Sequence, residues 1–262
     1  MEKLYVIKIG GNIVDNESAL SSFLDSFAAL SERKILVHGG GKVATRLAED
    51  LKLPQQLIDG RRITDAETLK VVTMVYAGLI NKTIVAALQS KGANAIGLTG
   101  ADGNAILAHK RNHATIDYGF AGDVDKVNAP MISGLLEQGL NIVFAPITHN
   151  NHGQLLNTNA DTIAQELAKG LSEKYEVNLI YSFEKEGVLA DASDETTVIR
   201  TIDPETYLSL KTANAIFAGM IPKLDNAFAA LKSGVTKVII GKAERLNDLI
   251  NGNAGTTITD AA

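Results

Sequence analysis

Short apolar runs alternate with longer amphipathic segments along most of the chain. Between the runs, apolar residues recur three or four positions apart, as in residues 20–30 and 65–89, which predicts helices. Nearly continuous apolar strands that alternate with helices are typical of a mainly parallel sheet with both faces covered. We therefore expect an α/β fold of three layers (αβα), with a central, mainly parallel sheet between two layers of helices. The runs that predict strands span residues 4–9, 34–38, 95–98, 141–145, 177–181 and 237–240.

Residues 106–127 depart from this alternation, because they are polar and rich in glycine. We expect them to form hairpins at an edge of the sheet. The rest of the chain has no linker rich in proline or serine, no repeat and no low-complexity run. We therefore expect a single domain over residues 1–262, in which any two lobes share one continuous sheet.

Composition excludes several classes of protein. None of the 262 residues is cysteine, so disulfides, thiolate zinc sites and cysteine nucleophiles are excluded. A net charge of −5 and the absence of tryptophan argue against a nucleic-acid partner. No run approaches about 18 consecutive apolar residues, so we expect no membrane span. The first apolar run, residues 4–7, is too short for a signal peptide, and we expect a cytoplasmic protein.

Glycine residues gather where the predicted strands end. Gly10 and Gly11 follow the first strand, residues 39–41 are three glycines after the second, and Gly187 and Gly219 lie near later elements. In open α/β sheets, ligands bind outside the carboxyl ends of the strands, and glycine lets backbone N–H groups approach an anion. A strand-to-helix turn also favours glycine without any ligand. Two such turns together predict a site for phosphate or carboxylate.

A dinucleotide site is an alternative use of these glycines. Gly39, Gly41 and Ala44 fit the pattern G-x-G-x-x-A, and Asp59 follows at nearly the expected distance. However, this turn is not the first in the chain, and residues 55–58 make only a weak strand. An NAD-binding oxidoreductase therefore stays an alternative, whereas a Walker-type phosphate loop is excluded because Val43 occupies the Ser/Thr position.

Four charged residues occupy unusual positions. Lys8 lies inside an apolar strand, either at a sheet edge with its ammonium group in water or directed at a phosphate. Lys223 begins a helix, where the helix dipole opposes a cation unless an anion binds there. Asp161 also begins a helix, either as its cap or as a partner of the lysines. Arg62 is either a surface residue or a bidentate ligand of a carboxylate.

The histidines show no pattern of metal ligands and no Ser-His-Asp order, and we expect no metal held by side chains. His38, before the three glycines, is expected to be a hydrogen-bonding scaffold rather than a base.

Five motifs together resemble the amino acid kinase family. They occur in the family's order and span nearly the whole chain. The lysine–glycine start is shared across the family, whereas the third and fourth motifs together are specific to its branch acting on N-acylated glutamate. The motifs are Ile7-Lys8-Ile9-Gly10-Gly11, His38-Gly39-Gly40-Gly41, Gly60-Arg61-Arg62-Ile63-Thr64-Asp65, Asn157-Thr158-Asn159-Ala160-Asp161 and Gly219-Met220-Ile221-Pro222-Lys223.

The resemblance implies transfer of a phosphoryl group from ATP, with Mg²⁺ held mainly through the nucleotide phosphates, to the side-chain carboxylate of an N-acylated glutamate. N-acetyl-L-glutamate is the default substrate, with N-succinylglutamate or another amino acid as alternatives. Residues 1–172 would form the lobe for the amino acid and residues 173–262 the nucleotide lobe. Arginine-inhibited hexameric relatives carry an extra N-terminal helix before the first strand. We therefore expect an arginine-insensitive homodimer, with the helix of residues 65–89 either as its interface or as an ordinary core helix.

The resemblance also implies a role for each motif residue. Lys8 and Lys223 would stabilise the transferred phosphoryl group, and Asp161 would organise both lysines. Glu184 stands where the family usually has an aspartate, which is the one departure from the pattern. The amino acid would be bound by Gly40, Gly41, Arg62, Asn157 and Asn159, and the nucleotide by Gly10, Gly11, Glu184, Lys185, Gly187, Gly219 and Met220.

Overall fold

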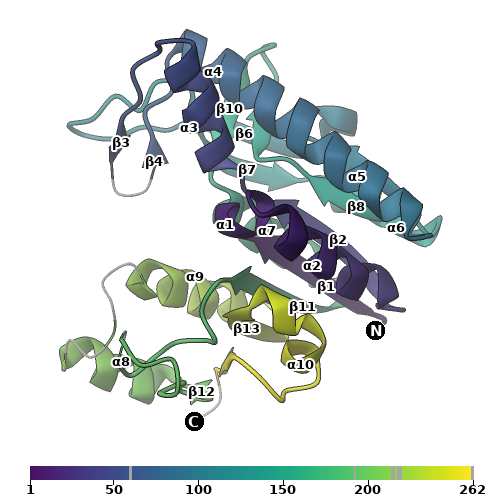
Figure 1. Cartoon of the computed structure of the whole chain (residues 1–262), viewed down its shortest axis with the longest axis vertical. Helices are drawn as coiled ribbons and strands as arrows, with labels where there is room; N and C mark the ends of the chain where they lie inside the picture. The colour runs from purple at the N-terminus through teal and green to yellow at the C-terminus, as the bar shows by residue number, and fades with distance from the viewer. Residues whose placement is uncertain (59–60, 192, 214–215, 217–219, 261–262) are drawn as a thin grey trace.

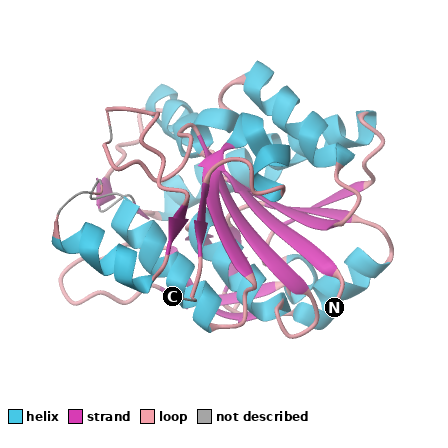
Figure 2. Cartoon of the chain, turned by 90° about the horizontal axis from the view of Figure 1, so that it is seen from below, coloured by secondary structure: helices cyan, strands magenta, loops and turns pink. Residues whose placement is uncertain are grey.

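A twisted sheet of eight strands runs through the molecule (Figures 1 and 2). The structure, a computed structural model, describes residues 1–58, 61–191, 193–213, 216 and 220–260. Within these residues the strand order is β12-β14-β13-β11-β1-β2-β8-β5, and every pair from β13 to β5 is parallel. The strands are β1 (Lys3–Ile9), β2 (Arg33–His38), β5 (Ala95–Leu98), β8 (Asn141–Phe144), β11 (Glu176–Phe183), β12 (Thr201–Ile202), β13 (Lys237–Lys242) and β14 (Thr256–Ile258).

The predicted parallel core of the sheet is confirmed. All six predicted strands are present, and each end lies within two residues of its predicted position. β14 is antiparallel to β13, which makes the sheet mixed at one edge. Because β11 pairs with β1 along seven residues, the sheet continues from the first part of the chain into the last. The division into lobes at residue 172 stays a prediction.

Helices cover both faces of the sheet, as Figure 2 shows, which confirms the three-layer prediction. The alternation along β1 sends Leu4 and Val6 to one face, where α7 packs, and Ile7 and Ile9 to the other. Lys8 is in phase with Leu4 and Val6, so its side chain leaves the strand on the α7 face. The first layer contains α6 (Ala129–Glu137), α7 (Ala160–Leu171) and α9 (Ile221–Lys232); the second contains α2 (Glu17–Ala29), α3 (Gly41–Asp50), α4 (Ala66–Thr73), α5 (Asn81–Ser90) and α10 (Leu246–Ile250).

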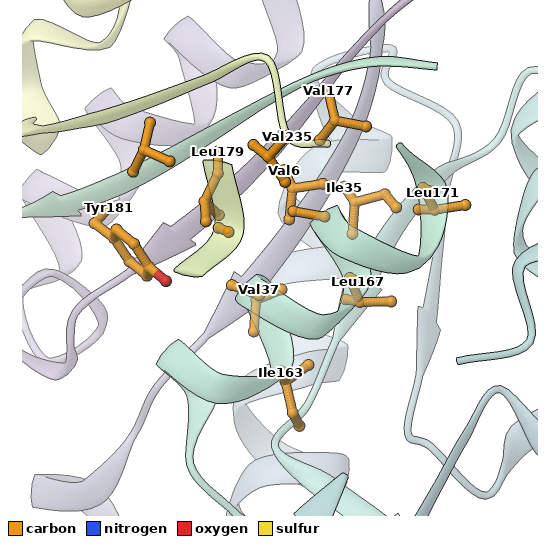
Figure 3. Close-up of a cluster of buried hydrophobic side chains, with 14 of the residues drawn as sticks. Val6, Ile35, Val37, Ile163, Leu167, Leu171, Val177, Leu179, Tyr181 and Val235 are labelled. Carbon is orange, nitrogen blue, oxygen red and sulfur yellow. The ribbon is translucent and has the colours of Figure 1, made fainter. Parts of the chain in front are cut away.

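Helix α7 packs on the middle of the sheet through one apolar stripe. Ile163, Leu167 and Leu171 recur every four residues and lie in one buried cluster with Val6 and Val37 of the strands (Figure 3). Burial of such side chains stabilises the fold by about 1.5–3 kcal/mol each. This packing fixes the position of the first turn of α7, which carries Asp161.

The prediction for residues 106–127 is only partly right. They form the antiparallel pair β6 (Ile106–Lys110) and β7 (Ala121–Val127), but this hairpin is not at an edge of the main sheet. It closes into a small separate sheet with β9 (Ile147–His149) and β10 (Leu155–Thr158), and β10 contacts α4 (Figure 1). The error arose because β9 and β10 are too short and too polar to be recognised from periodicity, so the hairpin had no visible partner but the main sheet.

Residues 66–90 form one continuous helix, in which a π-helical stretch, Met74–Ile80, joins α4 to α5. By length and composition alone this helix could cross a membrane. Its polar residues interrupt the apolar runs, so the sequence did not predict this. Leu69, Val72, Ile84 and Leu88 are buried against the sheet, so packing inside the protein explains much of its apolar character. The remaining short elements are α1 (Gly11–Val14), β3 (Leu57–Ile58), β4 (Arg61–Arg62), α8 (Pro204–Thr212) and the 3₁₀ turns Asp102–Asn104 and Ala243–Arg245.

Candidate active site

Two glycine turns pack against each other at the carboxyl ends of β1 and β2. Gly10 and Gly11 lead into α1, and Gly40 and Gly41 lead into α3. A Cβ atom on Gly39 would lie 3.4 Å from the backbone nitrogen of Gly11. Gly40 has a φ of 150°, and a Cβ atom there would lie 2.3 Å from a side-chain carbon of Ile80. Gly40 is therefore required as glycine by its backbone conformation and by Ile80, whereas a Cβ atom on Gly39 would make only an ordinary contact with the other turn.

A cavity of about 210 Å³ opens in front of these turns. Its volume suits a ligand smaller than a typical drug molecule. The hairpin β3–β4, the end of β6 and the start of α7 form its other walls. Of the residues predicted for the site, it is lined by Lys8, Gly11, Gly40, Gly41, Arg62, Asn157, Asn159 and Asp161.

Asp161, which lines the cavity together with Lys8, pairs with two lysines. Lys8 Nζ lies 2.8 Å from Asp161 Oδ1, and Lys223 Nζ lies 3.3 Å from Oδ2. Burial alone would raise the pKa of Asp161, but the two ammonium groups outweigh it and lower the pKa to about 2. The three side chains, which we call the charge triad, therefore carry a net charge of +1 at neutral pH. Because β1 lies between β11 and β2, the interpretation of Lys8 as an edge lysine is wrong.

Asn159, rather than Asp161, caps α7. Asn159 Oδ1 accepts hydrogen bonds from the backbone N–H groups of Asp161 (2.8 Å) and Thr162 (3.1 Å). The carboxylate of Asp161 is therefore not used as the helix cap and is available to both lysines. Asn159 lines the cavity as well as capping the helix, and its contact with the amino acid stays a prediction.

Arg62 is buried, so its interpretation as a surface residue is wrong. Its guanidinium donates to the backbone oxygen of Gly41 (3.0 Å) and to Thr45 Oγ1 (2.8 Å), and also to Gln55. All three acceptors are neutral, so the charge of Arg62 faces the cavity without a carboxylate partner in the part of the chain described. Asn157 Nδ2 donates to Thr64 Oγ1 (3.0 Å), which ties the opposite wall to the same hairpin.

Of the predicted nucleotide residues, Gly11 lines this cavity, whereas Glu184, Lys185 and Gly187 do not. Glu184 is exposed after the end of β11, and Lys185 pairs with Glu195 at 3.2 Å. Gly187 is buried, and a Cβ atom there would lie 2.7 Å from Thr256 Oγ1. Their role in nucleotide binding stays a prediction.

Gly10 and Met220, two further predicted nucleotide residues, do not line the cavity either. Gly10 donates its N–H to the backbone oxygen of Ser182 (3.1 Å), and Met220 precedes α9. Gly219 is outside the described residues.

Arg61, Tyr76 and Arg111 also line the cavity, although the sequence did not predict them for the site. Arg61 stood beside Arg62 in a recognised motif, and Tyr76 stood in the long helical pattern. Arg111 gave no signal, because only the closed sheet of β6, β7, β9 and β10 brings it to the cavity.

Side chains offer no cage for a metal ion. Across residues 1–58, 61–191, 193–213, 216 and 220–260, no group of three or more His, Asp or Glu residues is placed to bind one. The carboxylate of Asp161 is engaged by two lysines. This donor set fits a divalent cation only if phosphate oxygens of a bound nucleotide supply most of its ligands.

His38 lies fully buried beneath the triple-glycine turn, as the scaffold prediction requires. Its Nδ1 is 2.7 Å from the backbone oxygen of Gly39, and its Nε2 is 3.4 Å from Asn81 Nδ2. This arrangement suits a neutral ring that donates from Nδ1 and accepts at Nε2. Burial lowers the pKa of His38 to about 4.

The low pKa of His38 predicts a loss of stability in mild acid. The unfolded chain takes up a proton near pH 6.5, whereas the folded ring stays neutral until about pH 4. Stability therefore falls as the pH drops through this window, by up to about 3 kcal/mol. Urea unfolding at pH 7.0 and 4.5 measures the effect against His38→Gln, which should lose most of this pH dependence. An equal pH dependence in both proteins would contradict the prediction.

The hairpin β3–β4 argues against the dinucleotide alternative. In that alternative, the strand after α3 would join the parallel sheet and end at the acidic residue. β3 instead pairs only with β4, antiparallel and outside the main sheet. Asp59 itself is outside the described residues.

Comparison with known proteins agrees with the geometry. The chain is 59% identical over 254 residues to the acetylglutamate kinase of Cytophaga hutchinsonii, covering 97% of this chain and 96% of the relative. Two solved structures share the fold. One is N-acetylglutamate synthase from Neisseria gonorrhoeae in complex with coenzyme A and N-acetyl-glutamate (TM-score 0.84, 23% identity, 100% of this chain, 60% of that one). The other is carbamate kinase from Giardia lamblia bound to AMP-PNP (TM-score 0.70, 14% identity, 99% of each chain).

The match to a family model extends over nearly the whole fold. It covers residues 3–242, from the first residue of β1 to the last residue of β13, and includes the charge triad and both glycine turns. The chain therefore belongs to the amino acid kinase family.

Proposed function

We propose that this protein transfers the γ-phosphoryl group of ATP to the side-chain carboxylate of N-acetyl-L-glutamate, giving an acyl phosphate and ADP. The charge triad carries the proposal, because Lys8 and Asp161 line the small cavity and Asp161 pairs with the ammonium groups of both Lys8 and Lys223. The name of the Cytophaga hutchinsonii relative supports the choice of substrate and its place in arginine biosynthesis.

The chemistry needs no general base. A glutamate side chain is already ionised at pH 7, since its unperturbed pKa is about 4.3. One carboxylate oxygen forms the new bond to the γ-phosphorus, and the bond from that phosphorus to the β,γ-bridging oxygen breaks, leaving ADP. Catalysis then consists of placing two anions in line and neutralising charge on the transferred group. Lys8 and Lys223 supply that charge, and Asp161 holds both ammonium groups in place.

The cavity walls suit the rest of the amino acid. Arg62 and Asn157 would bind the α-carboxylate, and the N–H groups of Gly40 and Gly41 would donate to the acylated glutamate. Gly11 would donate to the phosphates. A Mg²⁺ ion bound through those phosphates would neutralise further charge on the nucleotide.

An ADP-release assay with ATP and Mg²⁺ tests the proposal. We expect ADP release to require N-acetyl-L-glutamate, and the acyl phosphate to be trapped by hydroxylamine as a hydroxamate. Release with free glutamate or aspartate instead would assign another substrate within the family. Absence of ATP turnover together with saturable NAD binding would support the oxidoreductase alternative.

We further propose a cytoplasmic homodimer that associates through the long helix. Of the residues predicted for the interface, Met74 and Leu79 are 55% and 60% exposed, whereas Val75 and Tyr76 are buried in the core. Light scattering should give twice the chain mass of 27.8 kDa. Changing both Met74 and Leu79 to Glu should give the mass of one chain, whereas Leu208→Glu, at an exposed position on α8, should not. A monomeric wild-type protein would contradict the prediction.

A further inference from the structure

The cavity carries more positive charge than N-acetyl-L-glutamate can use. Among the described residues that line it, Lys8, Arg61, Arg62 and Arg111 are cationic, and Asp161 is the one acid. The proposed substrate brings two carboxylates, one for the charge triad and one for Arg62. Its acetyl methyl group is neutral, so nothing in that ligand pairs with Arg61 or Arg111. Arg111 is already paired with Asp123, so Arg61 is the lining cation for which the described residues show no partner, and leaving a partly buried cation unpaired is unfavourable.

Arg111 is held in a fixed orientation with one of its donors unsatisfied. Its backbone N–H donates to Ala121 at 2.8 Å, which anchors the residue beside β7. Its guanidinium pairs with Asp123 and lies over the ring of Tyr118, with 5.7 Å from Cζ to the ring centre. The Nε atom is buried and has no hydrogen-bond partner. Asp123 and Tyr118 therefore orient the guanidinium while one buried donor stays unsatisfied, which costs about 1–3 kcal/mol.

Arg61 adds a second guanidinium group to the same region. In the part of the chain that the structure describes, no hydrogen bond or ion pair to its guanidinium is formed. Burial lowers the pKa of Arg61, and the like charge of Arg111 lowers it further, against the opposing effect of Asp123. An anion bound between the two guanidinium groups would relieve both effects.

The two guanidinium groups are separate from the expected site of the α-carboxylate. Arg62 is tied to α3 through Gly41 and Thr45. Arg111 directly follows β6, beside the closed sheet where β10 pairs Asn157 with Ala121 of β7. Asn157 thus lies between the wall that carries Arg62 and the wall that carries Arg111. An acyl arm leaving the α-nitrogen toward the β6–β7 wall would reach Arg111 and Arg61.

We propose that Arg61 and Arg111 form a subsite for a carboxylate at the far end of the acyl arm. The preferred substrates are then N-acylated glutamates whose acyl group derives from a short dicarboxylic acid, with N-succinyl-L-glutamate as the probe. This inference rests on the proposed kinase function and specifies its acyl group. N-acetyl-L-glutamate is still phosphorylated, because the triad and Arg62 bind the part that both substrates share.

Three substrates separate the charge of the acyl arm from its length. N-acetyl-L-glutamate lacks the arm, N-succinyl-L-glutamate carries a terminal carboxylate, and N-succinamoyl-L-glutamate has the same length with a neutral amide. A hydrogen bond to a charged group contributes about 1.5–3 kcal/mol. We therefore expect kcat/KM for the succinyl substrate to exceed that for either of the others by about 10–100-fold.

Variants of Arg111 locate the effect. Arg111→Gln should remove most of the preference while changing kcat/KM for N-acetyl-L-glutamate by less than about threefold. Because this change leaves Asp123 without its partner, the double variant Arg111→Gln/Asp123→Asn provides a second test with the same expected result. Lys110→Gln is the matched control. It removes the neighbouring cation at the end of β6, where Lys110 pairs with exposed Asp117 at 3.3 Å outside the cavity, and it should keep the preference.

The outcomes separate the two proposals. If N-acetyl-L-glutamate is phosphorylated but the succinyl substrate is no better than the succinamoyl one, the subsite is wrong and the kinase function stands. A preference that survives in both Arg111 variants also overturns the subsite. If none of the three releases ADP, the kinase function is wrong. Calorimetric titration with the succinyl and acetyl compounds then decides whether the cationic subsite binds the extra carboxylate.

Discussion

Replacing Lys8 by alanine is expected to lower kcat by a factor of about 10²–10³. Lys8 lines the cavity as part of the charge triad, where the proposed function brings the carboxylate and the phosphoryl group together. Removing it lowers the net charge of the triad from +1 to zero just where negative charge gathers in the transition state. The α-carboxylate and acyl arm keep their own partners, so KM for the amino acid should change by less than about threefold.

Lys223→Ala should produce a loss of the same order, because its ammonium group lies on the other oxygen of Asp161. Lys3→Ala is the control, since it removes an exposed lysine from the opposite end of the same strand. Steady-state kinetics with ATP and the amino acid varied in turn give kcat and both KM values. An unchanged kcat in either triad variant contradicts the assignment. A variant that is mostly unfolded under the assay conditions has lost kcat through a folding defect instead.

Much of the fold could be predicted because buried parallel strands are nearly all apolar. The β1 residues 4–7 and 9 are apolar for this reason, and both faces of the strand are covered. The strands that were missed, such as β3, β10 and β12, have two to four residues. Segments this short carry no usable period, and their pairing depends on contacts distant in the chain.

The pairing within the charge triad could not be predicted from the sequence pattern alone. A lysine inside an apolar strand and one at a helix start are visible as anomalies, but neither indicates its partner. The pairing of Lys8 with Asp161 depends on the phase of β1 and on α7 starting at Ala160, which only the fold provides. The family resemblance supplied the roles in advance. It did not supply Arg111, which lies outside the five motifs.

Asp161→Asn is expected to lower kcat by about 10²-fold without weakening the binding of ATP. The amide can no longer hold two ammonium groups by charge, so Lys8 and Lys223 lose their fixed positions relative to the transferred group. At the same time the net charge of the triad rises from +1 to +2, which favours the binding of an anionic nucleotide. KM for ATP should therefore stay unchanged or fall. A higher KM for ATP with kcat unchanged would show that Asp161 does not organise the lysines.

Stability measurements on Asp161→Asn separate positioning from capping. Because Asn159 caps α7, we expect the circular dichroism spectrum of the variant to match that of the wild type. The carboxylate has a pKa of about 2 in the folded protein, below its ordinary value of 3.8, so it stabilises the fold above pH 3.8. The change should cost about 2 kcal/mol at neutral pH, and the difference should vanish as the pH falls through 2. Glu205→Gln is the matched control, because it also removes an acidic charge from the first turn of a helix, α8. This change should lower the free energy of unfolding by no more than about 1 kcal/mol and leave kcat unchanged. If Asp161→Asn unfolds the protein at neutral pH, the residue acts chiefly in folding and the positioning role is wrong.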